Sequence, residues 1–288
     1  MSEGLETVSC NLCGSDRCRV LYHRPYAPAS LSECAATTDE FANYGRVVRC
    51  LDCGLAYTNP RPTRAALMAG YGACVDESYL AESSSRSINA HLSLSVIKRF
   101  ASSGRLLEVG TATGYFLNAA RVDFETAGLE PSSWAAKIAR ERFKLDVQEE
   151  TIDKARFAPE SFDAVAMIDV IEHLSDPQDA LERSYRWLKP GGLLYLVTPD
   201  IGSLSAALLR GSWWGLRPAH LYYYDRRTLG TALEKAGFEV AFEKSFGRIF
   251  SYGYWASRLR NYPAWVHQGM QAAIRGLGIR DKLLYLDT

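Results

Sequence analysis

Short apolar runs alternate with longer amphipathic stretches from about residue 104 onward. The runs have the length and aliphatic content of buried parallel strands; they are Leu106–Val109, Ala127–Leu129, Ala164–Ile168 and Leu193–Val197. The stretches between them have helical spacing; they are Tyr115–Val122, Ser132–Phe143 and Gln178–Leu188. Pro131-Ser132 and Asp176-Pro177 supply helix starts, and Pro190-Gly191-Gly192 supplies a stop. The alternation predicts a doubly wound α/β sheet that binds its ligand at the carboxyl ends of the strands.

The chain on either side of this unit has its own predicted elements. Apolar periodicity from Ile88 to Phe100 predicts a helix that leads into the sheet and lies over its ligand site. Later segments predict a helix at Thr228–Ala236 that stops at Gly237, a further strand at Glu239–Phe246 and an amphipathic helix at 262–277. The final run Leu283–Leu286 leaves two possibilities open: it closes the sheet as a last strand, or the sheet stops short of closure.

Four cysteines form two knuckles near the beginning of the chain, Cys10-Asn11-Leu12-Cys13-Gly14 and Cys50-Leu51-Asp52-Cys53-Gly54, with 36 residues between Cys13 and Cys50. Two residues between cysteines let one tight turn present both thiolates to a tetrahedral ion. The glycine after each knuckle permits the positive φ with which such a turn exits. A redox pair or a chance pairing is the alternative, but the second knuckle with the same glycine disfavours both. The pattern predicts a closed, structural zinc site at Cys10, Cys13, Cys50 and Cys53.

Composition narrows the classes of function. The 288 residues are 47% hydrophobic and 23% charged, as in folded globular proteins, and Lys plus Arg equal Asp plus Glu at 33 each. A net charge of zero disfavours binding to long stretches of nucleic acid. The chain has no run of 18 apolar residues, and its first residues are acidic rather than signal-like, so we expect a cytoplasmic protein that does not enter a membrane.

The turn after the first strand identifies the cofactor class. It reads Leu107-Glu108-Val109-Gly110-Thr111-Ala112-Thr113-Gly114-Tyr115, which lacks the third glycine of a dinucleotide fingerprint and the lysine of a P-loop. This E-x-G-x-A-x-G sequence resembles motif I of the class I S-adenosylmethionine-dependent methyltransferases. The resemblance implies that the loop wraps the methionine moiety, with cofactor contacts from Glu108, Gly110, Ala112, Gly114 and Tyr115.

Further blocks follow in the order of the same superfamily, from about residue 100 to 246. Glu130 ends the second strand, where its carboxylate can accept both ribose hydroxyls, and Asp169 follows the fourth strand. The resemblance also places the adenine contacts around Glu150–Asp153. Taken singly, Glu108 pairing with Lys137 and Glu130 as a solvated acid are ordinary alternatives. The ordered series favours cofactor binding.

Asp169, Glu172 and His173 are spaced i, i+3 and i+4, so one helical turn would place them on one face. A similar E-x-x-E-H stretch binds a divalent cation in ubiquinone-pathway O-methyltransferases and in small-RNA 2′-O-methyltransferases. That resemblance implies a magnesium site at these three residues. The interpretation we favour is that they orient the strand-end loop beside the sulfonium.

An aromatic stretch after the fifth strand carries one histidine, His220, between Trp213-Trp214 and Tyr222–Tyr224. It falls at the carboxyl end of the sheet, where a methyl acceptor would bind. Histidine titrates near neutrality, so His220 is the leading candidate for a general base, and His173 is the next. We expect the acceptor to sit among Trp213, Trp214 and Tyr222.

Together these features predict a Rossmann-like class I methyltransferase sheet with a small N-terminal zinc-binding domain. The predicted parts are a four-cysteine zinc module at 1–62, a helical linker or lid at 63–103, the methyltransferase domain at 104–258 and a helical tail with a last strand at 259–288. This combination resembles a bacterial group that includes deoxysugar C-methyltransferases and other biosynthetic methyltransferases. It implies methyl transfer to an oxygen or carbon of a small molecule.

Two alternatives to this function belong to other classes. One is an RNA methyltransferase whose zinc module holds nucleic acid. Base N-methyltransferases commonly carry an (N/D)-P-P-(Y/F) loop where this chain reads Asp169-Val170-Ile171-Glu172. The other is a non-catalytic binding module, which the intact set of Glu108, Gly110, Gly114 and Glu130 disfavours.

Overall fold

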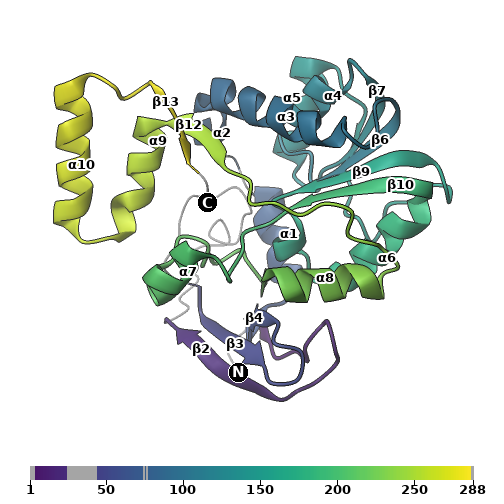
Figure 1. Ribbon diagram of the computed structural model, residues 1–288, viewed down its shortest axis with the longest axis horizontal. Coiled ribbons are helices and arrows are strands. Elements are labelled where there is room, and N and C mark those ends of the chain that lie inside the picture. The colour runs from purple at the N-terminus through teal and green to yellow at the C-terminus, as the bar shows by residue number, and fades with distance from the viewer. Residues whose placement is uncertain (1–3, 25–43, 74, 76, 287–288) are drawn as a thin grey trace.

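A five-stranded parallel sheet forms the centre of the computed structural model, which describes residues 4–24, 44–73, 75 and 77–286 (Figure 1). Its strand order is β10-β9-β6-β7-β8. The bounds are β6 Gly104–Val109, β7 Phe124–Leu129, β8 Val147–Gln148, β9 Phe162–Ile168 and β10 Leu188–Val197. All four predicted strands are present, and the α/β fold class is confirmed.

Helices cover both faces of this sheet, as the doubly wound prediction requires. Helices α3 (Ser83–Ile97), α4 (Tyr115–Ala120) and α5 (Ser133–Phe143) pack on the face that carries Leu106 and Ala164. Helix α6 (Pro177–Trp187) packs on the other face, against Val165 and its neighbours. Consecutive strand residues point to opposite faces, so both cores draw on the same strands.

Helix starts follow the local signals in the sequence. The Ser132 side chain accepts from the N–H of Ala135 to cap α5, and Asp176 accepts from Asp179 to cap α6. Helix α6 ends at Trp187, one residue earlier than predicted, because β10 begins at Leu188. The Pro190-Gly191-Gly192 stop falls inside β10, where the pairing register shifts between Leu188 and Leu193.

The prediction of a strand at Glu239–Phe246 is wrong. The segment forms no ladder, and its apolar members Val240 and Phe242 stay 43% and 42% exposed. The apolar side chains of this segment therefore bury too little surface to stabilise it as a strand of the sheet. Helix α8 (Arg226–Lys235) precedes this segment, close to the predicted helix.

The end of the chain forms a separate subdomain rather than a last strand of the main sheet. Strand β12 (Arg248–Ser251) pairs antiparallel with β13 (Leu283–Leu286), and the two form their own ribbon. Helices α9 (Tyr252–Ser257) and α10 (Ala264–Leu277) lie between them along the chain (Figure 1). The predicted helix at 262–277 is confirmed, and the run Leu283–Leu286 does not close the main sheet.

The N-terminal part is a small antiparallel structure. Its sheet has the order β11-β4-β3-β2, with β2 Cys18–His23, β3 Arg46–Cys50, β4 Ala56–Thr58 and β11 Tyr222–Tyr223. Strands β1 (Leu5–Glu6) and β5 (Arg61–Pro62) form a second pair. Short helices α1 (Arg64–Ala73) and α2 (Glu77–Ala81) lead to α3.

A shared core joins this N-terminal structure to the rest of the molecule. Cys10, Leu55 and Tyr57 pack in one cluster with Leu181 of α6 and Ala232 of α8. Within the described ranges, no helix is both long and apolar enough to cross a membrane.

Candidate active site

The loop from β6 to α4 has the conformation that its small residues permit. Gly110, Ala112 and Gly114 all have positive φ, at 76°, 48° and 89°. A Cβ at Gly110 would lie 2.5 Å from Val170 Cγ2, and one at Gly114 would lie 2.7 Å from Leu145 Cδ1. Glycine is therefore required at both positions. Ala112 has a left-handed backbone at a cost of about 1 kcal/mol.

Glu130, at the end of β7, is bonded to this loop. Its Oε2 accepts from the N–H of Ala112 at 2.7 Å, and its Oε1 accepts from the N–H of Ser132 at 2.8 Å. Each oxygen keeps a second lone pair for a ligand hydroxyl. Burial raises the pKa of Glu130 to about 7.

Glu108 lies on β6, next to β7, and is 4% exposed. Its Oε2 has no hydrogen-bond partner among the described residues. Burial, and secondarily the charge of Glu130, raise the pKa of Glu108 well above its usual value. A buried acceptor without a partner at the edge of a cavity fits a ligand that donates hydrogen bonds there.

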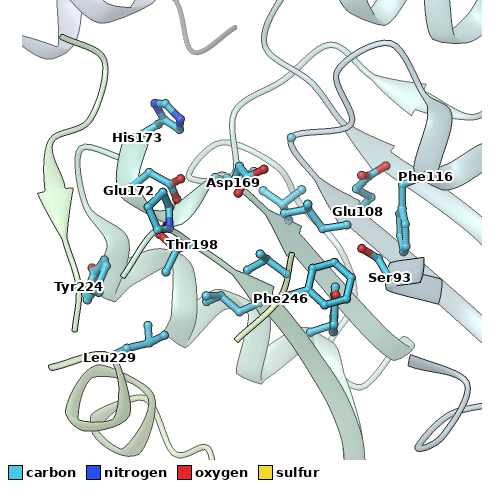
Figure 2. Close-up of a pocket in the computed structure, with 18 of the residues that line it drawn as sticks. Ser93, Glu108, Phe116, Asp169, Glu172, His173, Thr198, Tyr224, Leu229 and Phe246 are labelled. Atoms are coloured by element: carbon cyan, nitrogen blue, oxygen red, sulfur yellow. Dashed lines mark hydrogen bonds between the residues drawn. The ribbon is translucent and has the colours of Figure 1, made fainter. Parts of the chain in front are cut away.

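A cleft begins at this loop, passes the carboxyl ends of the strands and continues along β10 to its start at Leu188, with a total volume of about 2920 Å³. The lining includes Tyr115, the segment Glu150–Asp153 and Ser93 of the linker helix α3. Figure 2 shows Glu108 and Ser93 on one side of the space, Glu172 and His173 on the other, and Asp169 between them. This total exceeds the roughly 300–1,000 Å³ of a typical small-molecule site because it includes the open space beside β10.

Asp169 does not join Glu172 and His173 on one helical face. It has a φ of 55°, and a short 3-10 turn, η2 (Ile171–His173), follows it instead of an α-helix. Its carboxylate pairs with Arg248 Nη2 of β12 at 2.6 Å. The predicted metal-ligating set of Asp169, Glu172 and His173 is therefore not the set that the fold brings together.

The groups that do converge are Glu172, His173 and His220. One carboxylate oxygen and one nitrogen from each ring lie within 4.8 Å of one another, and all three residues are buried. Glu172 Oε2 accepts from Thr198 Oγ1 at 2.9 Å, whereas Oε1 has no hydrogen-bond partner in the described part of the chain. The two imidazoles meet edge to face, with their centroids 4.6 Å apart.

Backbone carbonyls set the tautomer of both rings. His220 Nδ1 lies 2.9 Å from the Gly215 oxygen, and His173 Nδ1 lies 3.0 Å from the Ala219 oxygen. A carbonyl only accepts, so Nδ1 carries the hydrogen and Nε2 is left to take a proton or bind an ion. Burial lowers the pKa of His173 to about 4 and that of His220 well below its usual value. Burial and Asp169 raise the pKa of Glu172 to about 8.

The aromatic stretch divides between the cleft and the core. Trp214 and Tyr224 line the cleft beside His220. Trp213 and Tyr222 are instead buried in two separate core clusters. The expectation that Trp213 and Tyr222 surround the acceptor is thus not met, because their rings fill the core beneath it.

The profile of the family described as "Methyltransferase domain" matches residues 84–241, more than half of the chain. The chain belongs to the methyltransferase domain family. Together with the loop geometry above, this match supports the S-adenosylmethionine-dependent methyltransferase domain predicted from the sequence.

Two curated relatives each match just under half of this chain. A probable S-adenosylmethionine-dependent methyltransferase of Mycolicibacterium smegmatis is 30% identical over 137 residues, which cover 47% of this chain and 52% of the relative. A ubiquinone biosynthesis O-methyltransferase of Chelativorans sp. is 27% identical over 142 residues, covering 46% of this chain and 56% of the relative. The methyltransferase thus spans about half the length of these relatives.

Solved structures that resemble this chain include a methyltransferase from Thermotoga maritima, described as a possible histamine N-methyltransferase. It is 28% identical, with a TM-score of 0.45, and the match covers 57% of this chain and 75% of that one.

Two polar residues of the methyltransferase cleft were missed by sequence reasoning. Thr198 directly follows β10, and its position at a strand end was a signal that could have found it. Arg248 lies 79 residues from Asp169, outside every motif. Only the fold brings that pair together.

The four knuckle cysteines of the methyltransferase also converge. Their sulfur atoms lie within 4.8 Å of one another, with Cys10 and Cys53 at 3.4 Å and Cys13 and Cys50 at 3.5 Å. Gly14 and Gly54 donate from their N–H to the carbonyls of Cys10 and Cys50, and both have positive φ. The predicted four-cysteine cluster is confirmed.

Proposed function

We propose that this methyltransferase transfers a methyl group to an oxygen or a carbon of a small molecule, with His220 as general base. The observation that carries the proposal is one continuous cleft. It runs from the Glu108 and Glu130 carboxylates to the buried pair of His173 and His220. Donor and acceptor can be held in line within it, and alignment is the main requirement of a displacement at a sulfonium methyl.

The cofactor half of the cleft is proposed to use the motif residues named above. S-adenosylmethionine supplies the methyl group as a sulfonium. Glu130 would accept from the ribose hydroxyls with its outer lone pairs while its inner ones hold the loop. Glu108 Oε2 would accept from a donor of the methionine moiety, Gly110, Ala112, Gly114 and Tyr115 would line that end, and Glu150–Asp153 would contact adenine.

The acceptor half is proposed to centre on His220. Its neutral ring exposes only Nε2 as a base, because Nδ1–H is held by the Gly215 carbonyl. A proton taken from an acceptor hydroxyl or acidic carbon would create a buried cation. Glu172, whose Oε1 has no hydrogen-bond partner in the described ranges, lies close enough to balance that charge once its own carboxyl group is ionised, which its pKa of about 8 favours at alkaline pH. His173 is the second candidate for the base.

Zinc is the ion we propose for the four-cysteine cluster. Zinc–sulfur bonds of about 2.3 Å in a tetrahedron place the sulfurs about 3.8 Å apart. The 3.4 and 3.5 Å pairs need only a small expansion to reach that spacing. Four thiolates close the coordination sphere, so the ion would be structural.

A second, divalent ion is a minority proposal for the acceptor half. The resemblance implied magnesium at Asp169, Glu172 and His173, although we favoured a non-metal role for them, and the geometry favours Glu172, His173 and His220 as the set. Two rings that each donate Nδ1–H to a carbonyl have the orientation typical of histidine ligands.

Packing of the cysteine knuckles supports a small-molecule acceptor over RNA. Lys235 Nζ donates to the Leu12 carbonyl at 2.8 Å, and Arg227 Nη2 donates to the Cys53 carbonyl at 2.7 Å. Asn11 bonds to Asp176 at the start of α6. The knuckles are thus contacted by protein partners, and the cations Lys235 and Arg227 beside them are already engaged.

Labelled donor tests the proposal. The protein would be incubated with methyl-labelled S-adenosylmethionine and a cell extract that has been separated into small-molecule and RNA fractions. We expect label in the small-molecule fraction and its loss in His220→Ala. Label that enters only RNA would establish the alternative function.

A further inference from the structure

The sheet of the zinc module includes one strand, β11, from the part of the chain that carries His220. Strand β11, which directly follows His220 and Leu221, pairs antiparallel with β4 of the module, Tyr222 opposite Tyr57 and Tyr223 opposite Ala56. Figure 1 shows the module's sheet on the side of α8, opposite the side covered by α3, α4 and α5. The module therefore lies beside the acceptor half of the cleft and away from the linker helix α3.

Thr58, the last residue of β4, extends this pairing to His220. Its N–H donates to the Leu221 carbonyl at 2.9 Å, and its Oγ1 donates to the His220 carbonyl at 3.0 Å. The same segment is held from its other side, where Leu221 N–H donates to the Glu172 carbonyl at 2.8 Å. Leu221, which directly follows His220, is thus hydrogen-bonded to Glu172 through its N–H and to Thr58 of the module through its carbonyl.

Arg61 makes a second connection at the end of this segment. Its Nη1 donates to Tyr222 Oη at 2.8 Å and to the Ser175 carbonyl at 3.0 Å, while its Nε donates to Glu6 Oε1 at 2.9 Å. The guanidinium is nearly buried, so these bonds form in a low-dielectric setting where they are strong. One side chain thereby joins the module to β11 and to the loop that follows η2.

The cofactor half has no comparable contact with the module among the described residues. Glu130 is held by Ala112 and Ser132, and the backbone of the loop is held by Leu129, all within the methyltransferase sheet and its helices. A disturbance of β4 should therefore reach His220 without reaching the loop.

We propose that the zinc module is a positioning element for the acceptor site, in which Thr58 and Arg61 hold the segment that carries His220. Neither residue touches the acceptor, so both are positioning residues. The inference rests on the proposed function, because it takes the neighbourhood of His220 as the acceptor site. The test below requires no methyl transfer, so its failure and the failure of the proposed base are distinguishable.

Amide hydrogen exchange of the intact, metal-loaded chain tests the proposal in Thr58→Val, which removes only the hydroxyl. Loss of one buried hydrogen bond should speed exchange at the Leu221 amide by roughly three- to tenfold. Affinity for S-adenosylhomocysteine should stay within about twofold of wild type. Thr58→Ser restores the hydroxyl and should restore slow exchange.

The matched control is Ser184→Ala, which removes another buried hydroxyl bonded to a carbonyl, that of Ala180 in α6. It should leave exchange at Leu221 unchanged. Equal acceleration in Ser184→Ala, unchanged exchange in Thr58→Val, or a parallel loss of S-adenosylhomocysteine binding would each overturn the proposal. If Thr58→Val does not fold, Arg61→Lys replaces it, because a lysine cannot bond to all three partners at once. It should speed exchange at Leu221 and Tyr222, and normal exchange there would overturn the proposal.

Discussion

Replacing Glu130 with glutamine tests the cofactor half of the site with little change of shape. The carboxylate accepts one N–H with each oxygen and keeps one lone pair on each for the ribose. Glutamine retains one acceptor and turns a donor toward the other N–H. At least one charge-assisted hydrogen bond is lost, worth about 1.5–3 kcal/mol, so S-adenosylhomocysteine should bind roughly ten- to a hundredfold more weakly.

The pH dependence of the same binding supplies a second signature. Burial raises the pKa of Glu130 to about 7 in the free protein, and the ribose hydroxyls bind the ionised form. Affinity should therefore fall as the pH drops below 7 in wild type, because a proton must first leave the carboxyl group. The Glu130→Gln variant has no such proton, so this fall should be absent.

Isothermal titration calorimetry with S-adenosylhomocysteine measures both effects. Glu125→Gln is the matched control, because Glu125 lies on β7, the strand that directly precedes Glu130, with a side chain that is 75% exposed. It should leave the affinity unchanged, and thermal unfolding should show that both variants are folded. Unchanged affinity in Glu130→Gln would place the ribose elsewhere. An equal loss of affinity in Glu125→Gln would show that the effect comes only from the change in net charge.

Three other variants test the remaining parts. Elemental analysis of wild type should find one bound zinc per chain, and Cys13→Ser should lose it; wild-type protein without metal would contradict the site. Ala112→Gly should keep the affinity for S-adenosylhomocysteine and raise the melting temperature slightly. It relieves about 1 kcal/mol of left-handed backbone strain, which exceeds the cost of the greater conformational entropy that glycine gives the unfolded chain. A lower melting temperature would contradict this. His220→Ala should lower turnover by about 10²–10⁴-fold while S-adenosylhomocysteine binds normally, and near-normal turnover would move the role to His173.

Local patterns carried most of what could be predicted. The apolar runs and the capping signals Ser132 and Asp176 act over a few residues, so the sequence displays them directly. The same holds for the glycine loop, whose positive φ values demand small residues, and for the two cysteine knuckles.

Long-range pairing accounts for what sequence reasoning missed. Asp169 was grouped with Glu172 and His173 by helical spacing, but its partner is Arg248, and His220 joins the other two from a distant segment. Strand β11 is two residues long, and only its fit to β4 makes it a strand. The alternation at Glu239–Phe246 obeyed the strand pattern, yet the fold offers no surface that would bury it.

A crystal structure of the protein with bound S-adenosylhomocysteine tests the central claim most directly. The account predicts ribose hydroxyls within about 3.2 Å of the Glu130 oxygens and a sulfur that faces the space bounded by His220 and Glu172. A ligand bound away from the loop at Gly110–Gly114, or a sulfur directed away from His220, would contradict it.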